Sequence, residues 1–208
     1  MQTSLTFASI LSLAGVMLVG AMVPSVSVLA VSARSAASGF AHGVFTAVGI
    51  VIGDVVFILI AIYGLALLAV WLDGGFVLIQ YLGGAYLIWL GILLWRSRPH
   101  IGDSKSQGSS SWSESFLSGL LITLGDQKAI WFYLGFFPAF LDLTRLSFMD
   151  TGIIVITAVI AVGVPKVVYA YMAYRTGRIF GTSRVTNVLN RIAGGVMIAV
   201  GGYVTFRA

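Results

Sequence analysis

The stretch Gly119–Phe140, GLLITLGDQKAIWFYLGFFPAF, decides how this chain is interpreted. It is apolar enough to cross a lipid bilayer, yet Asp126 and Lys128 stand near its middle. A charged side chain at bilayer depth costs about 3 kcal/mol or more, so such residues usually face a partner or a wet cavity. Gly125 weakens a helix, and Gln127 adds another polar group. We therefore interpret the stretch as half of a solute site inside a helical membrane protein.

The composition of the whole chain supports a membrane location. Of its 208 residues, 59% are hydrophobic and 9% are charged, whereas soluble domains have about 25% charged residues. The 25 glycines suit helices that pack closely within a membrane. The net charge of +5 is better explained by basic cytoplasmic loops than by nucleic-acid binding.

The same composition argues against several kinds of functional site. With no cysteine and two histidines, the chain has no disulfide framework and few ligands for a metal, so we expect no metal centre and no cofactor. The sequence also has no GxxxxGK[ST] loop, no GxSxG elbow and no HExxH motif. An ATP-driven pump, a familiar hydrolase or another enzyme is therefore not indicated.

Six apolar stretches each approach the roughly 20 residues that a spanning helix needs. We expect an all-α membrane protein in which residues 1–208 form one transporter domain. The first stretch is too long for a signal peptide, and no basic residue precedes Arg34, so we expect it to be retained. The predicted helices are Leu5–Val31, Gly43–Leu72, Phe76–Trp95, Phe116–Phe140, Thr151–Tyr174 and Val188–Phe206.

The basic residues predict the orientation of these spans. Most of them lie in the loops after spans one, three and five and at the start of span six: Arg34, Arg96, Arg98, Lys105, Arg175, Arg178, Arg184 and Arg191. The opposite side has only Arg145 and Arg207. The positive-inside rule therefore places the odd-numbered loops in the cytoplasm and both termini outside it. The segment Arg175–Arg191 is also suited to binding anionic membrane lipid.

The loop Arg96–Ser115 is rich in serine and glycine and predicts a flexible cytoplasmic linker between two three-helix halves. Because three is an odd number, the second half must enter the membrane from the opposite side. This arrangement suits an inverted repeat whose broken helices meet at the midplane. By position, Pro24 in the first half matches Gly125–Asp126 in the second, and Asp54 matches Pro165–Lys166.

Four ionisable residues lie well inside the predicted spans: Asp54, Asp126, Lys128 and Lys166. Asp126 and Lys128 are two positions apart, so on a regular helix they face different directions and each needs a partner elsewhere, unless the helix breaks at Gly125. We expect Asp54 to pair with one of the two lysines. The alternative is that buried ion pairs only fix helix packing. We favour a functional role because four such groups occur in one small bundle.

The glycines before Asp54 and the carboxylate itself suggest separate roles. Gly49 and Gly53 have the spacing that lets another helix approach closely. Small-residue faces such as Gly39–Gly43, Gly49–Gly53 and Gly194–Gly202 suit packing either within one chain or between two copies in a homodimer. A carboxylate in a low-dielectric site can take up a proton, which makes Asp54 the candidate for proton coupling.

Prolines occur beside polar residues in the first and fifth spans. Proline removes a backbone donor and leaves a carbonyl four residues back without its usual partner. Near Pro24, that carbonyl could bind a polar solute or the hydroxyl of Ser25 or Ser27, or the proline could simply kink the helix. The charge of Lys166 favours a cavity-lining role for Pro165. Trp131 and Tyr133 either line a substrate path or pack in the core.

The ordered set of these blocks resembles the lysine exporter family, the LysE/RhtB amino-acid exporters. The resemblance covers almost the whole chain. It is carried by Gly49–Asp54 with Gly64–Ala66, by Gly84–Leu87 with Gly91, by Gly119, Lys128–Ala129 and Pro138, and by Asn190–Arg191 with Gly194–Gly195. The resemblance implies a six-helix carrier in the bacterial inner membrane that exports amino acids or related small solutes, driven by the proton gradient.

The sequence departs from this family where the substrate is expected to bind. The family has a Pro-Gly-Pro turn in the first span, whereas this chain reads Pro24-Ser25-Val26. In the fourth span the family has Asn-Pro-Lys, whereas this chain reads Asp126-Gln127-Lys128. We therefore expect milder helix breaks, and a site that favours cationic or zwitterionic solutes because it carries an added carboxylate.

These observations predict a proton-coupled amino-acid exporter that works by alternating access between its two halves. Asp54 is assigned to coupling, Asp126 and Lys128 to solute charges or gating pairs, and Lys166 to ion pairing. Pro24 and Pro165 are expected to break helices, and Ser25 and Gln127 to add polar groups to the site. Two alternatives are an inorganic cation exporter of the same superfamily and a carrier-derived membrane protein that acts as a partner without transporting.

Overall fold

The structure is a computed structural model that describes residues 5–23, 25–65, 76–96, 111–141, 146–177 and 183–207. Within these ranges every regular element is a helix, so the predicted all-α membrane fold is confirmed. The helices are α1 (Phe7–Met22), α2 (Val26–Ser38), α3 (Phe40–Leu59), the π-helix η1 (Ile60–Gly64), α5 (Phe76–Arg96), α6 (Trp112–Leu124), α7 (Gln127–Phe140), α8 (Phe148–Thr176) and α9 (Ser183–Arg207).

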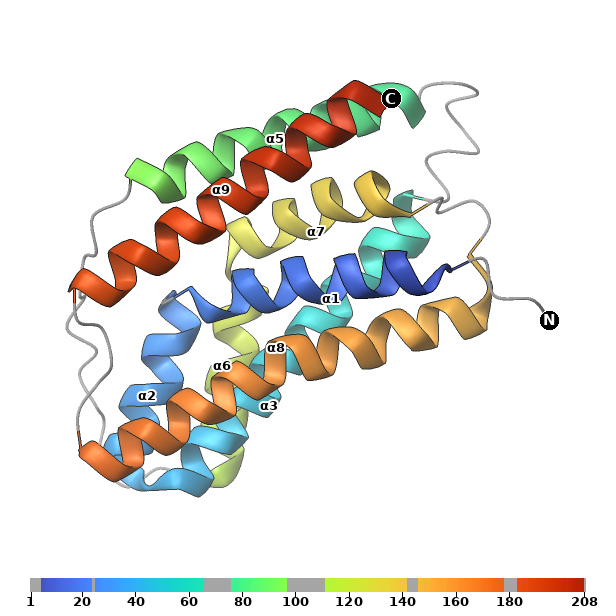
Figure 1. Cartoon of the computed structure of the whole chain (residues 1–208). Coiled ribbons are helices and arrows are strands. Elements are labelled where there is room, and N and C mark those ends of the chain that lie inside the picture. Colours follow the sequence, from blue (N-terminus) through green and yellow to red (C-terminus); the bar gives the residue numbers. More distant parts are fainter. Residues whose placement is uncertain are drawn as a thin grey trace.

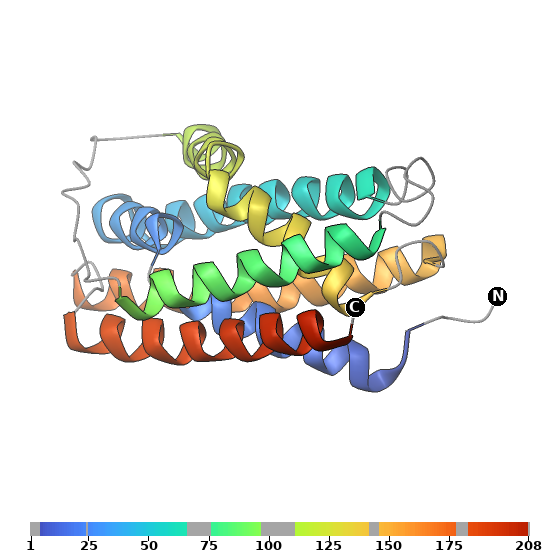
Figure 2. The same cartoon turned by 90° about the horizontal axis from the view of Figure 1, so that it is seen from above.

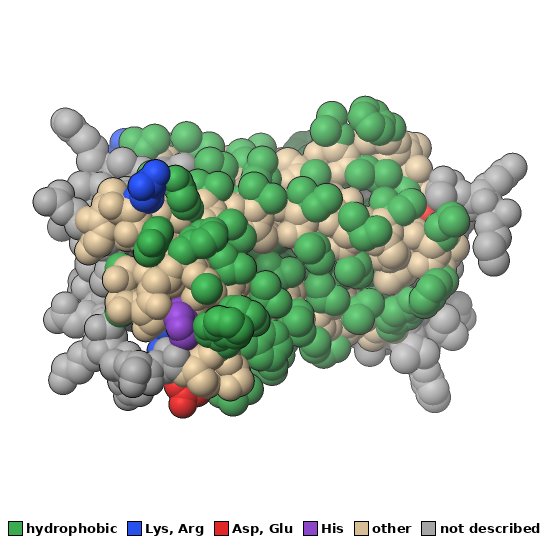
Figure 3. Space-filling view, turned by 90° about the horizontal axis from the view of Figure 1, so that it is seen from below, with side chains coloured by type: hydrophobic (Ala, Val, Ile, Leu, Met, Phe, Trp, Pro, Cys, Tyr) green, Lys and Arg blue, Asp and Glu red, His purple; other side chains and the backbone are tan. Residues whose placement is uncertain are grey.

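Several helices have the length and the apolar outer surface that a lipid bilayer requires. Within the described residues, α8 and the continuous helix Phe40–Gly64 are each long and apolar enough to span, and α1 with α2 forms a third candidate if the bent pair counts as one span. Figure 3 shows hydrophobic side chains across the middle of one face, with the visible charged side chains toward its ends. The count of six spans stays a prediction.

The first and fourth predicted spans are both broken into two helices. The axes of α1 and α2 differ in direction by 60° (Figure 1). Pro24 lies outside the described residues, but the last carbonyl of α1, at Met22, accepts a hydrogen bond of 2.9 Å from the Tyr169 hydroxyl on α8. A side chain thus satisfies one of the carbonyl groups that every helix end leaves without an intrahelical partner.

The break in the fourth span falls at Gly125–Asp126, as the sequence predicted. The Gly125 amide donates to the Leu121 carbonyl and ends α6, while the Asp126 carbonyl accepts from the amides of Ala129 and Ile130. Asp126 therefore lies at the N-cap position directly before α7, where aspartate is strongly preferred.

The prediction that Pro165 breaks the fifth span is wrong, because α8 continues through it from Phe148 to Thr176. A proline removes one amide donor, and the turns on either side keep their own hydrogen bonds. Transmembrane helices tolerate such a residue when neighbouring helices support the local backbone. Pro165 is buried within the bundle.

Several predicted boundaries also need correction. Helix α6 begins at Trp112, within the predicted linker 96–115, because Ser111 and Glu114 form a reciprocal capping box. The remaining linker residues 97–110 lie outside the described residues. Ser147 and Asp150 form the same motif and start α8 at Phe148 rather than Thr151.

Glycines determine which helices approach most closely. A Cβ on Gly194 would lie 2.5 Å from the carbonyl oxygen of Gly91, and one on Gly201 would lie 2.6 Å from that of Gly84. These four glycines form a seam between α5 and α9, which run antiparallel and side by side in Figures 1 and 2. Any side chain at Gly91 or Gly194 would push the two backbones apart.

A second seam joins α3 to α6. A Cβ on Gly49 would collide with the Phe116 carbonyl, and one on Gly119 with the Thr46 carbonyl. The close-packing role predicted for Gly49 and Gly53 is confirmed, since Gly53 also has no room beside Thr123. These contacts, like those of Gly194 and Gly201, lie within one chain.

The buried core lies between these units, where α1, α3, η1, α7 and α8 meet. Its largest enclosed side chains belong to Leu13, Ile58, Ile62, Leu87, Phe137 and Ile154. Figure 1 shows the α5–α9 pair on one side of this core and α3 with α8 on the other, with the start of α1 and the end of α9 at the same end of the molecule.

We expect Gly194→Ala to destabilise the protein, because its methyl group would displace the Gly91 backbone. The loss should be about 1–3 kcal/mol in the free energy of unfolding, as for other overpacked sites. The measurement is reversible unfolding of the purified protein in mixed detergent. Gly202→Ala, on the same helix and with no atom within 4 Å of the new carbon, is the matched control. Equal stability of the two variants would contradict the close seam.

Candidate solute-binding cavity

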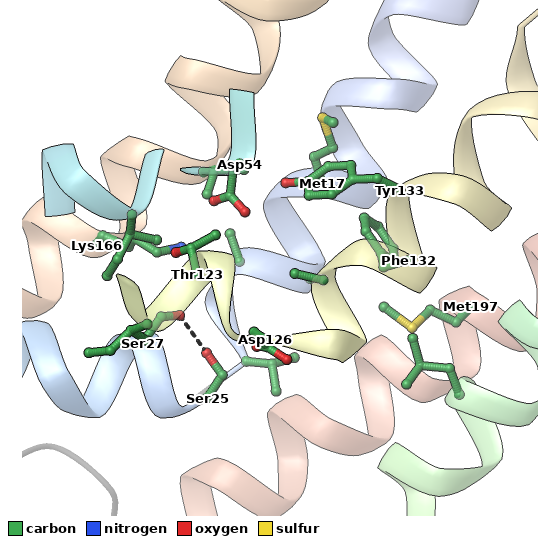
Figure 4. Close-up of a pocket in the computed structure, with 18 residues that line it drawn as sticks. Met17, Ser25, Ser27, Asp54, Thr123, Asp126, Phe132, Tyr133, Lys166 and Met197 are labelled. Atoms are coloured by element: carbon green, nitrogen blue, oxygen red, sulfur yellow. Dashed lines mark hydrogen bonds between the residues drawn. The ribbon is translucent and has the colours of Figure 1, made fainter. Parts of the chain in front are cut away.

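A cavity of about 200 Å³ lies where the two broken spans meet (Figure 4). Its walls come from α1, α2, α3, α5, α6, α7, α8 and α9 and from both breaks. Sites for drug-sized ligands typically measure about 300–1,000 Å³, so this volume suits a smaller solute.

Two opposite charges lie in the wall of this cavity. Asp54 on α3 is 8% exposed, and Lys166 on α8 is 4% exposed. The two side chains attract one another, and the Tyr133 phenol of α7 also hydrogen-bonds to the Asp54 carboxylate. Among the described side chains, Lys166 is the cation whose charge acts on Asp54, while the side chain of Lys128 lies outside the description. Because each charge offsets the other, both can be kept far from water.

Asp126 adds a second carboxylate on another side of the cavity. It is half-buried and directly precedes α7, and its charge acts on both Asp54 and Tyr86 of α5. Figure 4 shows the Asp54, Asp126 and Lys166 side chains around the same space. With Lys166 counted, the three described charges sum to one negative charge.

Hydroxyl groups and helix ends supply further polarity. The Ser25 and Ser27 hydroxyls lie 2.9 Å apart at the start of α2, and both residues line the cavity. Thr123 lines it near the end of α6, although its hydroxyl donates to the Gly119 carbonyl. The N-termini of α2 and α7 lie at this cavity, and their free amide groups favour negatively charged ligands.

The structure thus brings together four of the predicted site residues: Ser25, Asp54, Asp126 and Lys166. Pro165 is buried next to Lys166 but is not among the residues that line this cavity, contrary to its expected role. Tyr133 does line it.

Four other predicted positions lie wholly or partly outside the described residues. Pro24 lies outside the described residues. The backbones of Gln127 and Lys128 begin α7, whereas their side chains lie outside the description, as does that of Trp131. Their roles remain predictions.

Sequence reasoning missed the apolar part of the lining and one backbone feature. Met17, Leu90, Phe132, Val162 and Met197 line the cavity, yet each lies in an apolar stretch without a distinguishing signal. The π-helix η1 continues α3 six residues beyond Asp54. Such wider turns are often found at functional sites, but no residue pattern predicted this one.

The sequence of the chain is similar to a known protein family and to several individual proteins. Residues 18–207 match the family model described as LysE type translocator. The chain is 45% identical to an uncharacterized membrane protein of Synechocystis over 94% of both chains. It is 32% identical to a protein named leucine efflux protein of Enterobacter, over 61% of this chain and 60% of that protein. It is also 28% identical to an uncharacterized membrane protein of Vibrio cholerae, over 78% and 80%. No solved structure matches the chain.

If Asp54 and Lys166 compensate one another, removing either alone should destabilise the protein more than removing both. Breaking a buried pair typically costs about 3–5 kcal/mol, because the remaining charge is left without a partner. We expect Lys166→Met to lower the melting temperature and the added substitution Asp54→Asn to recover part of that loss. Glu114→Gln, which removes an exposed charge and keeps the capping box, is the control. Simple additivity of the two pocket substitutions would show that the charges do not interact.

Proposed function

Because the chain belongs to the LysE type translocator family, we propose that this membrane protein exports an amino acid or a related small solute across the bacterial inner membrane. Members of this family are transporters rather than enzymes, and the names of several relatives specify leucine efflux. We therefore take leucine as the first solute to test, followed by other amino acids and then divalent cations.

The observation that carries this proposal is a small cavity that holds opposite charges at the junction of two broken helices. An amino acid carries an ammonium group and a carboxylate. The carboxylate would bind near Lys166 and the amide groups at the start of α2, and the ammonium group would bind between Asp126 and Asp54. Transporters commonly bind solutes in this way, between the ends of discontinuous helices.

Asp54 would couple solute movement to protons. Without a proton, its carboxylate attracts both Lys166 and the solute's ammonium group; with a proton, it attracts neither. Proton and solute therefore compete for one site, and binding linkage requires the competition to be mutual. A carrier with this property exchanges one for the other, so protons entering down their gradient would drive the solute outward.

The breaks between α1 and α2 and between α6 and α7 would permit alternating access. At each break the backbone can change direction while the helices on either side stay intact. The tight α5–α9 and α3–α6 seams would then move as rigid units around the cavity.

We expect purified protein in proteoliposomes to move leucine against its gradient when a pH gradient is imposed. Asp54→Asn should abolish this accumulation, because it removes the protonatable group. It should keep the exchange of leucine between the two sides of the membrane, because the cavity itself remains intact. The measurement is uptake of labelled leucine with and without a proton ionophore. Glu114→Gln, a carboxylate loss outside the cavity, should behave as the unchanged protein. Persistence of gradient-driven accumulation in Asp54→Asn would exclude the coupling role.

The proposed orientation places the start of α6 in the cytoplasm and the start of α8 outside. Since the chain has no cysteine, single cysteines can report each position. Ser113→Cys should react with a membrane-impermeant maleimide only in inside-out vesicles, and Phe148→Cys only in right-side-out vesicles. Both residues are exposed in the structure. The reverse pattern would invert the topology.

A further inference from the structure

The cavity has two walls of different chemistry. Asp54, Lys166 and Asp126 lie on the polar side, which is formed by α3, α8 and the break before α7. The other side is formed by α1, α5 and α9, and its described lining is apolar. In Figure 4 the side chain of Met197 lies away from Asp54 and Lys166, across the cavity.

The apolar wall is closed by a contact between the first and last helices. Met17, Leu90 and Met197 are almost fully buried there, at 2%, 5% and 5% exposure. The Cε atom of Met197 lies 3.9 Å from where a Cβ on Gly20 would be, and both residues line the cavity. Gly20 of α1 and Met197 of α9 therefore form the boundary of the cavity at this end.

We infer that Met197 and Gly20 determine how large a side chain the transported amino acid can have. This inference rests on the proposed function, since it assumes that the charged groups of an amino acid occupy the polar wall. Its side chain would then extend toward the apolar wall formed by α1, α5 and α9. The site would favour an uncharged aliphatic side chain because that wall offers only apolar contacts.

The two residues would act in different ways. The α9 backbone is fixed by the glycine seam with α5, so the wall cannot easily move back. The Met197 side chain is long and unbranched, and methionine adapts to irregular apolar shapes. Gly20 has no side chain, which leaves space for one further methyl group. Because 3.9 Å is an ordinary van der Waals distance, alanine at this position would narrow the cavity without displacing Met197.

Opposite substitutions should therefore shift selectivity in opposite directions. Binding of free alanine, valine, leucine and phenylalanine to the full-length protein in detergent would be measured by scintillation proximity, and transport of the same solutes in proteoliposomes. Met197→Ala should raise the affinity for phenylalanine relative to leucine by about tenfold, the discrimination that one or two carbon atoms give in an apolar pocket. Gly20→Ala should lower the affinity for leucine relative to free alanine by a similar factor.

Gly15→Ala is the control, because Gly15 is on the same helix, is exposed, and has no atom within 4 Å of an added carbon. It should leave the order of affinities unchanged. A general folding defect would weaken the binding of all solutes together. It cannot produce opposite shifts in the ratio of their affinities.

The outcomes separate this inference from the function on which it rests. Opposite shifts in the two variants support the subsite. Binding with an unchanged size order in both variants overturns the subsite and leaves the exporter proposal in place. Binding without transport by the unchanged protein overturns the exporter proposal instead. An absence of both binding and transport for every amino acid overturns both.

Discussion

A buried charge in a membrane protein must have a partner, and the pair formed by Asp54 and Lys166 meets this requirement at the centre of the bundle. The pair links α3 to α8, which come from different predicted halves of the chain. The Tyr133 hydroxyl of α7 also hydrogen-bonds to the Asp54 carboxylate. These interactions hold α3, α7 and α8 around one small space, because leaving either buried charge without a partner would be unfavourable. The cavity lies between this charge pair and the two helix breaks.

The rest of the architecture supplies rigid parts on either side of that space. Glycines on α5 and α9 bring two backbones into contact, and those on α3 and α6 do the same. Neither seam tolerates a side chain, so each pair behaves as one body. The chain changes direction instead between α1 and α2 and between α6 and α7, and the Tyr169 hydroxyl donates a hydrogen bond to the Met22 carbonyl at the end of α1. Closely packed helix pairs combined with two broken helices suit a carrier that exposes one site to each side of the membrane in turn.

The sequence predicted the features that depend on local chemistry. The apolar stretches predicted the helices, and Gly125–Asp126 predicted the second break. The charges inside the predicted spans indicated Asp54, Asp126 and Lys166 as cavity residues. It failed where the outcome depends on neighbours. Pro165 was expected to break α8, but supporting helices keep the helix intact. Which lysine faces Asp54 depends on helix packing, and the apolar wall of Met17, Leu90 and Met197 looks like any other membrane sequence until α9 is placed beside α1.

The central claim is that the solute occupies the cavity between the two breaks. Thr123 lines this cavity and is 4% exposed, and the chain contains no cysteine, so Thr123→Cys provides a single reporter there. The most direct measurement is the rate at which a small maleimide alkylates this cysteine in proteoliposomes that transport leucine, with and without saturating leucine. Our account predicts that leucine slows alkylation at this position and leaves the rate at Ser113→Cys unchanged. Equal alkylation rates at Thr123→Cys with and without leucine, while transport continues, would contradict it.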